Sequence, residues 1–127
     1  MSSSTIQYIL DGVSVTVATL LIYTGVRCLQ NPLSLAKTFG LPTATREEVV
    51  FFQSSTGRNI GAGLFIYIMT YLKERRLLGI FFLCWSTAGM ADTKLLLEHP
   101  RGTKVLMHVR NTCVLLVLGP LLIKFAS

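Results

Sequence analysis

Four long apolar stretches, separated by short charged segments, constrain the fold of this chain more than any other feature. They cover residues 6–26, 49–72, 77–91 and 105–123. Each is close to the length of about 20 residues that crosses a bilayer as a helix once its flanks are counted. None carries a polar face wide enough for a surface helix, and a chain of 127 residues is too short to bury four such helices in a soluble core.

The second stretch is the least regular of the four, because Arg58 divides it and leaves residues 60–72 as its charge-free part. By length alone, that part could be a buried helix of a soluble protein. Composition favours the membrane, since 51% of the residues are hydrophobic and 14% charged, whereas soluble domains carry about 25% charged residues. We therefore predict an all-α fold, a four-helix transmembrane bundle of up-down-up-down topology. It forms one domain over residues 1–127, with helices near 6–28, 49–72, 77–97 and 105–124.

The charge pattern bears on partners and location. A net charge of +6 would suit nucleic acid, but the cations form no stripe and no aromatic stacking pattern accompanies them. Anionic lipid headgroups are the better counter-charge. We expect a multi-pass integral membrane protein whose partners are the bilayer and a lipophilic small molecule, with the endoplasmic reticulum as a candidate membrane. The first apolar run lacks a basic start and is interpreted as a retained helix.

No sequence pattern indicates a metal or a cofactor. The three cysteines, Cys28, Cys84 and Cys113, are odd in number and widely spaced, so they predict neither a disulfide framework nor a metal site. A GxxxG spacing at Gly57 and Gly61 indicates close helix packing rather than a phosphate loop.

Ionisable residues recur at one level of the predicted bundle. In each predicted helix, one ionisable residue is separated by 15 or 16 residues from a charged residue at the face that carries the termini. These four residues are Arg27, Arg58, Asp92 and His108, and their reference residues are Asp11, Lys73, Arg76 and Lys124. They would therefore share a depth about 22–24 Å from that face. Charges at such a depth are costly unless paired, and by default they mark a functional site. Polar residues expected at the same level are Asn59, Lys94, Arg110, Asn111 and Thr112.

Structural interpretations of this layer stand beside the functional one. Arginines near helix ends extend to the interface, which would account for Arg27 and Arg110. Asp92 is the only acid in the layer, so the arginines compete for it. Because Arg58 and Asp92 adjoin across a short hairpin, we predict that they form an ion pair, which could simply tie two helices together.

Several short motifs occur in this order along the chain: Gly25-Val26-Arg27, Pro32, Phe39-Gly40-Leu41-Pro42, Gly57-Arg58, Gly63-Leu64, Arg76 with Gly79, Ala91-Asp92 and His108. Together they resemble the motifs of a known protein family. The family is domain-of-unknown-function family 4267, small membrane proteins that look similar to DoxX-like proteins. The resemblance implies a four-helix membrane bundle. Fungal members are associated with gene sets for secondary metabolites, in which small membrane proteins can act as isomerases or cyclases. An acid often follows the family's arginine where this chain has Asn59, which leaves Asp92 as the main acidic candidate.

Three functions fit these residues. The first is a cofactor-independent isomerase or cyclase in which Asp92 and His108 move a proton on a lipophilic metabolite and Arg58 stabilises an oxyanion. The second is a lipid- or ligand-binding protein without catalysis. The third is a small transporter or complex subunit, which ranks last because no inverted repeat is visible. The predicted substrate-binding residues are Arg27, Asn59, Arg110, Asn111, Tyr67 and Trp85.

Overall fold

The computed structural model describes residues 1–127 and is all-α, as the apolar pattern predicts. Three of its helices are long and apolar enough to cross a membrane, which is consistent with a membrane protein: α1, α5 and α6. The predicted second transmembrane helix is instead two consecutive helices that meet at Arg58. The elements in chain order are α1 (Ser3–Gln30), α2 (Pro32–Phe39), α3 (Val49–Gly57), α4 (Asn59–Tyr71), α5 (Arg75–Glu98) and α6 (Val105–Lys124).

Local sequence explains where α1 and α2 begin and end. The Ser2 side chain accepts a hydrogen bond from the Thr5 amide and caps α1. Asn31 caps α2 in the same way, and Pro32 occupies the first turn, where its missing N–H costs nothing. Gly40 ends α2 with φ of 130°, a conformation that favours glycine. The predicted turn markers Pro32 and Gly40 therefore bound a short helix within the first connection.

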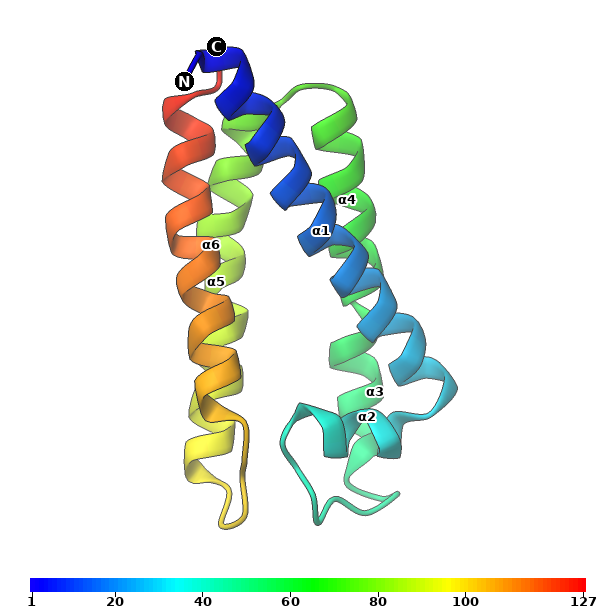
Figure 1. Ribbon diagram of the computed structural model, residues 1–127. Coiled ribbons are helices and arrows are strands. Elements are labelled where there is room, and N and C mark those ends of the chain that lie inside the picture. The colour runs from blue at the N-terminus through cyan, green and yellow to red at the C-terminus, as the bar shows by residue number, and fades with distance from the viewer.

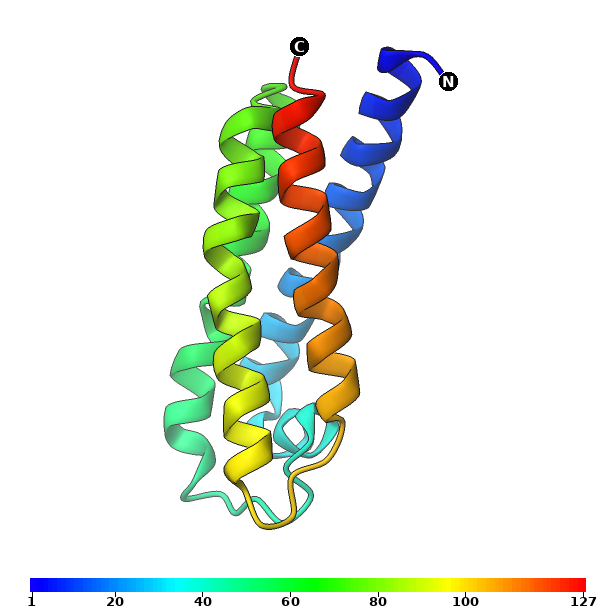
Figure 2. The same ribbon diagram turned by 90° about the vertical axis from the view of Figure 1, so that its left-hand side faces the viewer.

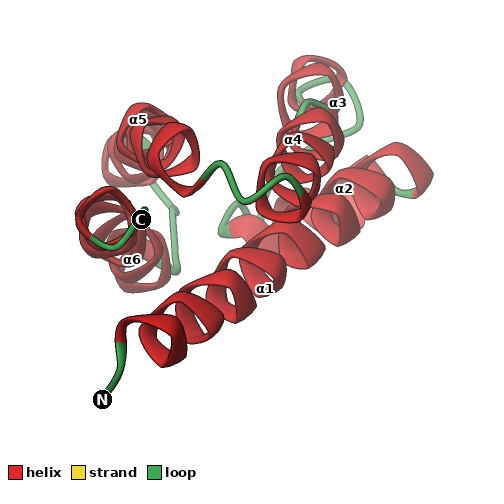
Figure 3. Ribbon diagram, turned by 90° about the horizontal axis from the view of Figure 1, so that it is seen from above, coloured by secondary structure: helices red, strands yellow, loops and turns green.

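The helices pack in two groups. α1 lies along α3 and α4, while α5 and α6 form a closely packed antiparallel pair. The groups meet where α4 contacts α5 and α1 contacts α6. Both termini lie at one end of the molecule, and α2 with its loops lies at the other (Figures 1 and 2). Seen from above, α1 is inclined so that it starts near α6 and ends beside α2 and α3 (Figure 3). The buried core is formed by Leu10, Ala18, Ile66, Leu78, Phe82, Leu115, Leu118 and Leu122.

Glycines permit the closest helix approaches. A Cβ atom on Gly63 would lie 2.7 Å from the Ala18 carbonyl oxygen of α1, and one on Gly79 would lie 2.5 Å from the Gly119 carbonyl oxygen of α6. Small residues allow such contacts between helices in membranes. The predicted role of the GxxxG spacing is wrong for Gly61, where an added Cβ meets nothing within 4 Å.

The two α4 glycines provide a matched test of this packing. Gly63→Ala is expected to lower the free energy of unfolding by about 1–3 kcal/mol, because the new methyl must displace backbone of α1. Gly61→Ala is expected to be neutral or stabilising by up to about 1 kcal/mol, because alanine has the better helix propensity. Unfolding of both variants in detergent measures the difference. Equal effects would show that α4 does not rely on Gly63 to pack on α1.

Candidate functional site

The structure brings two of the predicted catalytic residues together. Asp92 lies on α5, and His108 lies in the first turn of α6. The His108 Nδ1 atom is 3.9 Å from the Asp92 Oδ2 atom. The imidazole is nearly enclosed, with 9% of its side chain exposed, whereas 42% of the Asp92 side chain is exposed. The Asp92 carboxyl group can therefore be reached from outside, whereas the His108 imidazole beside it is nearly enclosed.

The other imidazole nitrogen fixes the tautomer of His108. Its Nε2 atom is 2.9 Å from the backbone carbonyl oxygen of Phe39. A carbonyl oxygen only accepts hydrogen bonds, so Nε2 carries a proton and donates it. In the neutral imidazole the lone pair is then on Nδ1, on the side of Asp92. The Phe39 ring packs against the imidazole at 4.4 Å between centroids and holds its plane.

The turn at Gly40 explains why the Phe39 carbonyl points at His108. The Gly40 carbonyl accepts a hydrogen bond of 2.8 Å from the Thr103 amide, which ties the end of α2 to the loop before α6. A Cβ on Gly40 would overlap the Thr103 carbonyl oxygen, and the positive φ is itself strained for other residues. Sequence reasoning missed Phe39 as a site residue. The signal available was the motif Phe39-Gly40-Leu41-Pro42.

The predicted ion pair between Arg58 and Asp92 is wrong. No arginine or lysine nitrogen lies within 4.0 Å of the Asp92 carboxylate, and His108 is its one ionic neighbour at that distance. The reason is helix pairing, since the α3–α4 segment packs on α1 whereas α5 packs on α6. Arg27, Arg58 and Arg110 are exposed and form no ion pair.

The predicted substrate-binding residues are divided among different surroundings. Asn59 donates a hydrogen bond of 3.2 Å to Thr24, and the Tyr67 hydroxyl is hydrogen-bonded to Thr19. Both side chains thus connect α4 to α1. Trp85 lies on α5, where its ring stacks on Phe81. Asn111 is exposed, whereas the neighbouring Thr112 hydroxyl is buried and donates to the His108 carbonyl oxygen at 2.8 Å.

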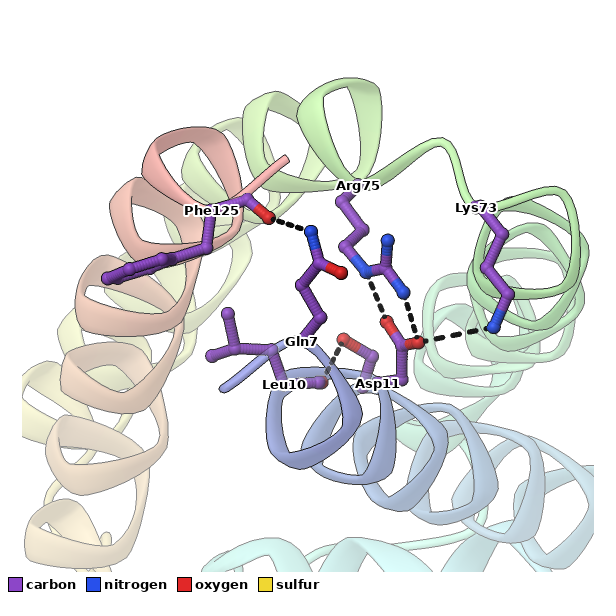
Figure 4. Close-up of polar contacts among 7 residues, drawn as sticks. Gln7, Leu10, Asp11, Lys73, Arg75 and Phe125 are labelled. Carbon is purple, nitrogen blue, oxygen red and sulfur yellow. Dashed lines mark hydrogen bonds and ion pairs between the residues drawn. The ribbon is translucent and has the colours of Figure 1, made fainter. Parts of the chain in front are cut away.

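A second polar cluster lies at the end of the molecule that carries the termini (Figure 4). Arg75 donates two hydrogen bonds to Asp11, from Nε at 2.9 Å and from Nη2 at 2.7 Å. Lys73 Nζ approaches the same carboxylate at 3.5 Å. Nearby, the Gln7 side-chain amide donates to the Phe125 carbonyl oxygen at 2.9 Å. Because both carboxylate oxygens are occupied by cations, this cluster is suited to tying α1 to α5 and α6 rather than to proton transfer.

Sequence reasoning used Asp11 only as a marker of depth and missed its partner. The available signal was an acid inside an apolar stretch, which requires a nearby cation. Arg75 is the residue that supplies it, and only 9% of its side chain is exposed.

One family model matches the chain. It is described as domain of unknown function (DUF4267), and the match covers residues 18–122. The chain belongs to this family. The resemblance inferred from the short motifs is thereby confirmed, and the matched range includes Phe39, Asp92 and His108. Asp11 lies before the matched range, whereas Arg75 lies inside it. No match was found among curated proteins or solved structures.

Proposed function

We propose that the protein is an isomerase or cyclase that transfers a proton on a lipophilic metabolite, with Asp92 and His108 as the reacting groups. The observation that carries the proposal is the orientation of His108. Its Nε2–H is held by the Phe39 carbonyl oxygen, and its Nδ1 atom faces the partly exposed Asp92 carboxyl group. An imidazole with one nitrogen fixed and the other free beside a carboxyl group is suited to general acid–base catalysis.

The chemistry needs two proton transfers and no net oxidation. The exposed Asp92 carboxylate removes a proton from a carbon beside a substrate carbonyl, and the C–H electron pair moves into an enolate. Protonated Asp92 then donates its proton to a different carbon of that enolate, which shifts the double bond. In a cyclisation the enolate carbon instead attacks an electrophilic double bond of the same substrate, and Asp92 protonates the anion left when that double bond opens. Between the two transfers, His108 Nδ1 can hold this proton across the 3.9 Å separation from Asp92, and after the second transfer both groups are in their starting states. Arg58 forms no ion pair with the Asp92 carboxylate, so we give it no direct role in the two proton transfers.

The membrane setting belongs to the same proposal. We place α1, the consecutive helices α3 and α4, α5 and α6 as four crossings of alternating direction, with the endoplasmic reticulum as host membrane. His108 is three residues from the start of α6, and Asp92 is six residues from the end of α5. The pair is therefore within about 5–9 Å of the helix ends, where an amphiphile can reach it from the lipid. Tags on both termini should be accessible from the same side, and tags on opposite sides would contradict this topology.

The deciding experiment compares metabolites. Lipid extracts from cells of the native source with and without the gene are analysed by chromatography and mass spectrometry. The proposal predicts that one lipophilic compound accumulates in cells without the gene and that a product of equal mass disappears, because isomerisation and cyclisation conserve mass. Identical extracts would overturn it and favour a binding role. Loss of a compound without an isomer of equal mass would also contradict the proposed reaction class.

A further inference from the structure

We infer that the substrate is an elongated amphiphile whose acidic or enolisable head lies at Asp92 and whose apolar tail follows a row of residues on α5. This inference rests on the proposed function and names the substrate class of the same site. The row consists of Phe81, Trp85, Ala88 and Asp92, and the name α5 row is used for these four residues. Their spacing of i, i+4, i+7 and i+11 places them on one face of an α-helix.

The α5 row is aromatic at one end and acidic at the other. The Phe81 and Trp85 rings stack, with centroids 5.6 Å apart and planes inclined by 18°. Both rings pack beside the core but remain partly exposed, as does Ala88. Phe65 of α4 packs on Phe81 at 4.8 Å and marks the far end of the row. Between Trp85 and Asp92 the row carries only the small side chain of Ala88, which is partly exposed.

The helical rise gives the dimensions of the ligand. Trp85 is seven residues before Asp92 and Phe81 is eleven before it, so they lie about 10 Å and about 16 Å from the acid along the axis. A head group at the Asp92–His108 pair would therefore place the middle of an extended tail against Trp85. The end of a tail about 16 Å long would meet Phe81 and Phe65.

The charge distribution favours an acidic or enolate-forming head. The half of the molecule that contains α2, opposite the termini, carries eight basic residues and four acidic residues. This excess gives that end of the molecule a net positive charge, which favours a ligand head that is negative or becomes negative during the reaction. The cations are Arg27, Lys37, Arg46, Arg58, Lys94, Arg101, Lys104 and Arg110, and the acids are Glu47, Glu48, Asp92 and Glu98.

Trp85 is the single tryptophan of the chain, so its fluorescence reports on the α5 row directly. The probes are long-chain fatty acids that carry bromine next to the carboxylate, about 10 Å from it, or at the tail tip. Bromine quenches tryptophan on close contact. Purified protein in mild detergent should show saturable quenching that is strongest with the middle position. Non-brominated fatty acid of the same length should displace the brominated probe and restore the Trp85 fluorescence.

Two alanine variants separate the α5 row from the rest of the helix. Ala88→Leu places a larger side chain between Trp85 and Asp92, and it should weaken the apparent affinity for the mid-chain probe about tenfold. Ala91→Leu is the control, because Ala91 is exposed and lies off the row; its affinity should be unchanged. Equal weakening in both variants would overturn the inference. If Ala88→Leu does not fold, the dependence on bromine position in the unaltered protein decides instead.

The outcomes also distinguish this inference from the proposed function. Saturable, position-dependent quenching in a protein whose gene does not alter cellular metabolites would support the ligand geometry and overturn the catalytic proposal. Quenching that is linear in probe, or equal for all three bromine positions, would overturn the ligand geometry even where the metabolite comparison reveals an isomer.

Discussion

Asp11→Asn is expected to lower the free energy of unfolding by about 3–5 kcal/mol, the usual cost of removing one partner from a buried ion pair. Only 9% of the Arg75 side chain and 13% of the Asp11 side chain are exposed. Asparagine keeps the shape of the aspartate but removes its charge, so the Arg75 guanidinium is left without a counter-ion. Lys73 cannot compensate because it is itself a cation. Unfolding in mixed detergents measures the loss.

The control for this prediction is another ion pair of the same chain. Lys94 and Glu98 form an i,i+4 pair at 2.7 Å, but 73% and 65% of their side chains are exposed. Glu98→Gln should therefore cost no more than about 0.5 kcal/mol. The exchange of both charges, Asp11→Arg with Arg75→Asp, should recover part of the stability. If Asp11→Asn costs no more than Glu98→Gln, the cluster in Figure 4 does not hold α1 to α5.

Apolar length predicts the long helices well because it is a local property of the chain. The helix predicted at 105–124 has the observed bounds, and those predicted at 6–28 and 77–97 are one to three residues shorter at each end than α1 and α5. The prediction of one continuous helix over residues 49–72 is wrong at Arg58, which is the one charged residue inside that segment. Arg58 remains near helical backbone angles, with φ of −62° and ψ of −19°, so the helix is interrupted there rather than turned aside.

Depth along the helices predicted only part of the candidate site. Counting residues correctly placed Asp92 and His108 at one level. They meet because α5 packs closely on α6, with Gly89 against Thr112 near the pair and Gly79 against Gly119 further along the helices. The same count placed Arg58 at that level, but depth says nothing about lateral position. The glycine contact of Gly63 with α1 directs α4 to α1. The spacing of charges along the sequence does not show which helices pack against each other.

The missing part of the site is a backbone group. The Phe39 carbonyl oxygen holds His108, and a carbonyl is present at every position of the chain, so residue type does not reveal it. What distinguishes this carbonyl is the turn that follows it. Gly40 permits the positive φ and the close approach to Thr103 that fix its direction. In this chain the sequence signal for the turn is therefore Gly40 at the end of a short helix, but the sequence does not show which side chain the preceding carbonyl binds.

Asp92→Asn and His108→Gln are each expected to lower turnover by about 10²–10⁴-fold, the usual contribution of a general acid or base. Asparagine keeps the size of Asp92 but carries no transferable carboxyl proton. Glutamine at position 108 can still donate a hydrogen bond to the Phe39 carbonyl oxygen, but it has no nitrogen that accepts a proton near neutral pH. The measurement is the ratio of the two isomers in extracts of cells that express each variant at normal abundance.

His99 supplies the matched control, because the chain has only two histidines. His99 lies in the loop after α5, where its Nδ1 atom accepts a hydrogen bond of 3.3 Å from the Arg101 amide. His99→Gln should therefore leave the isomer ratio unchanged.

If Asp92 and His108 act as one unit, the double variant should be no slower than the worse single variant, because either substitution already stops the proton from completing its path. Losses that multiply in the double variant would instead mean that the two side chains act independently. Wild-type isomer ratios in both single variants would mean that the pair holds α5 to α6 and carries no proton.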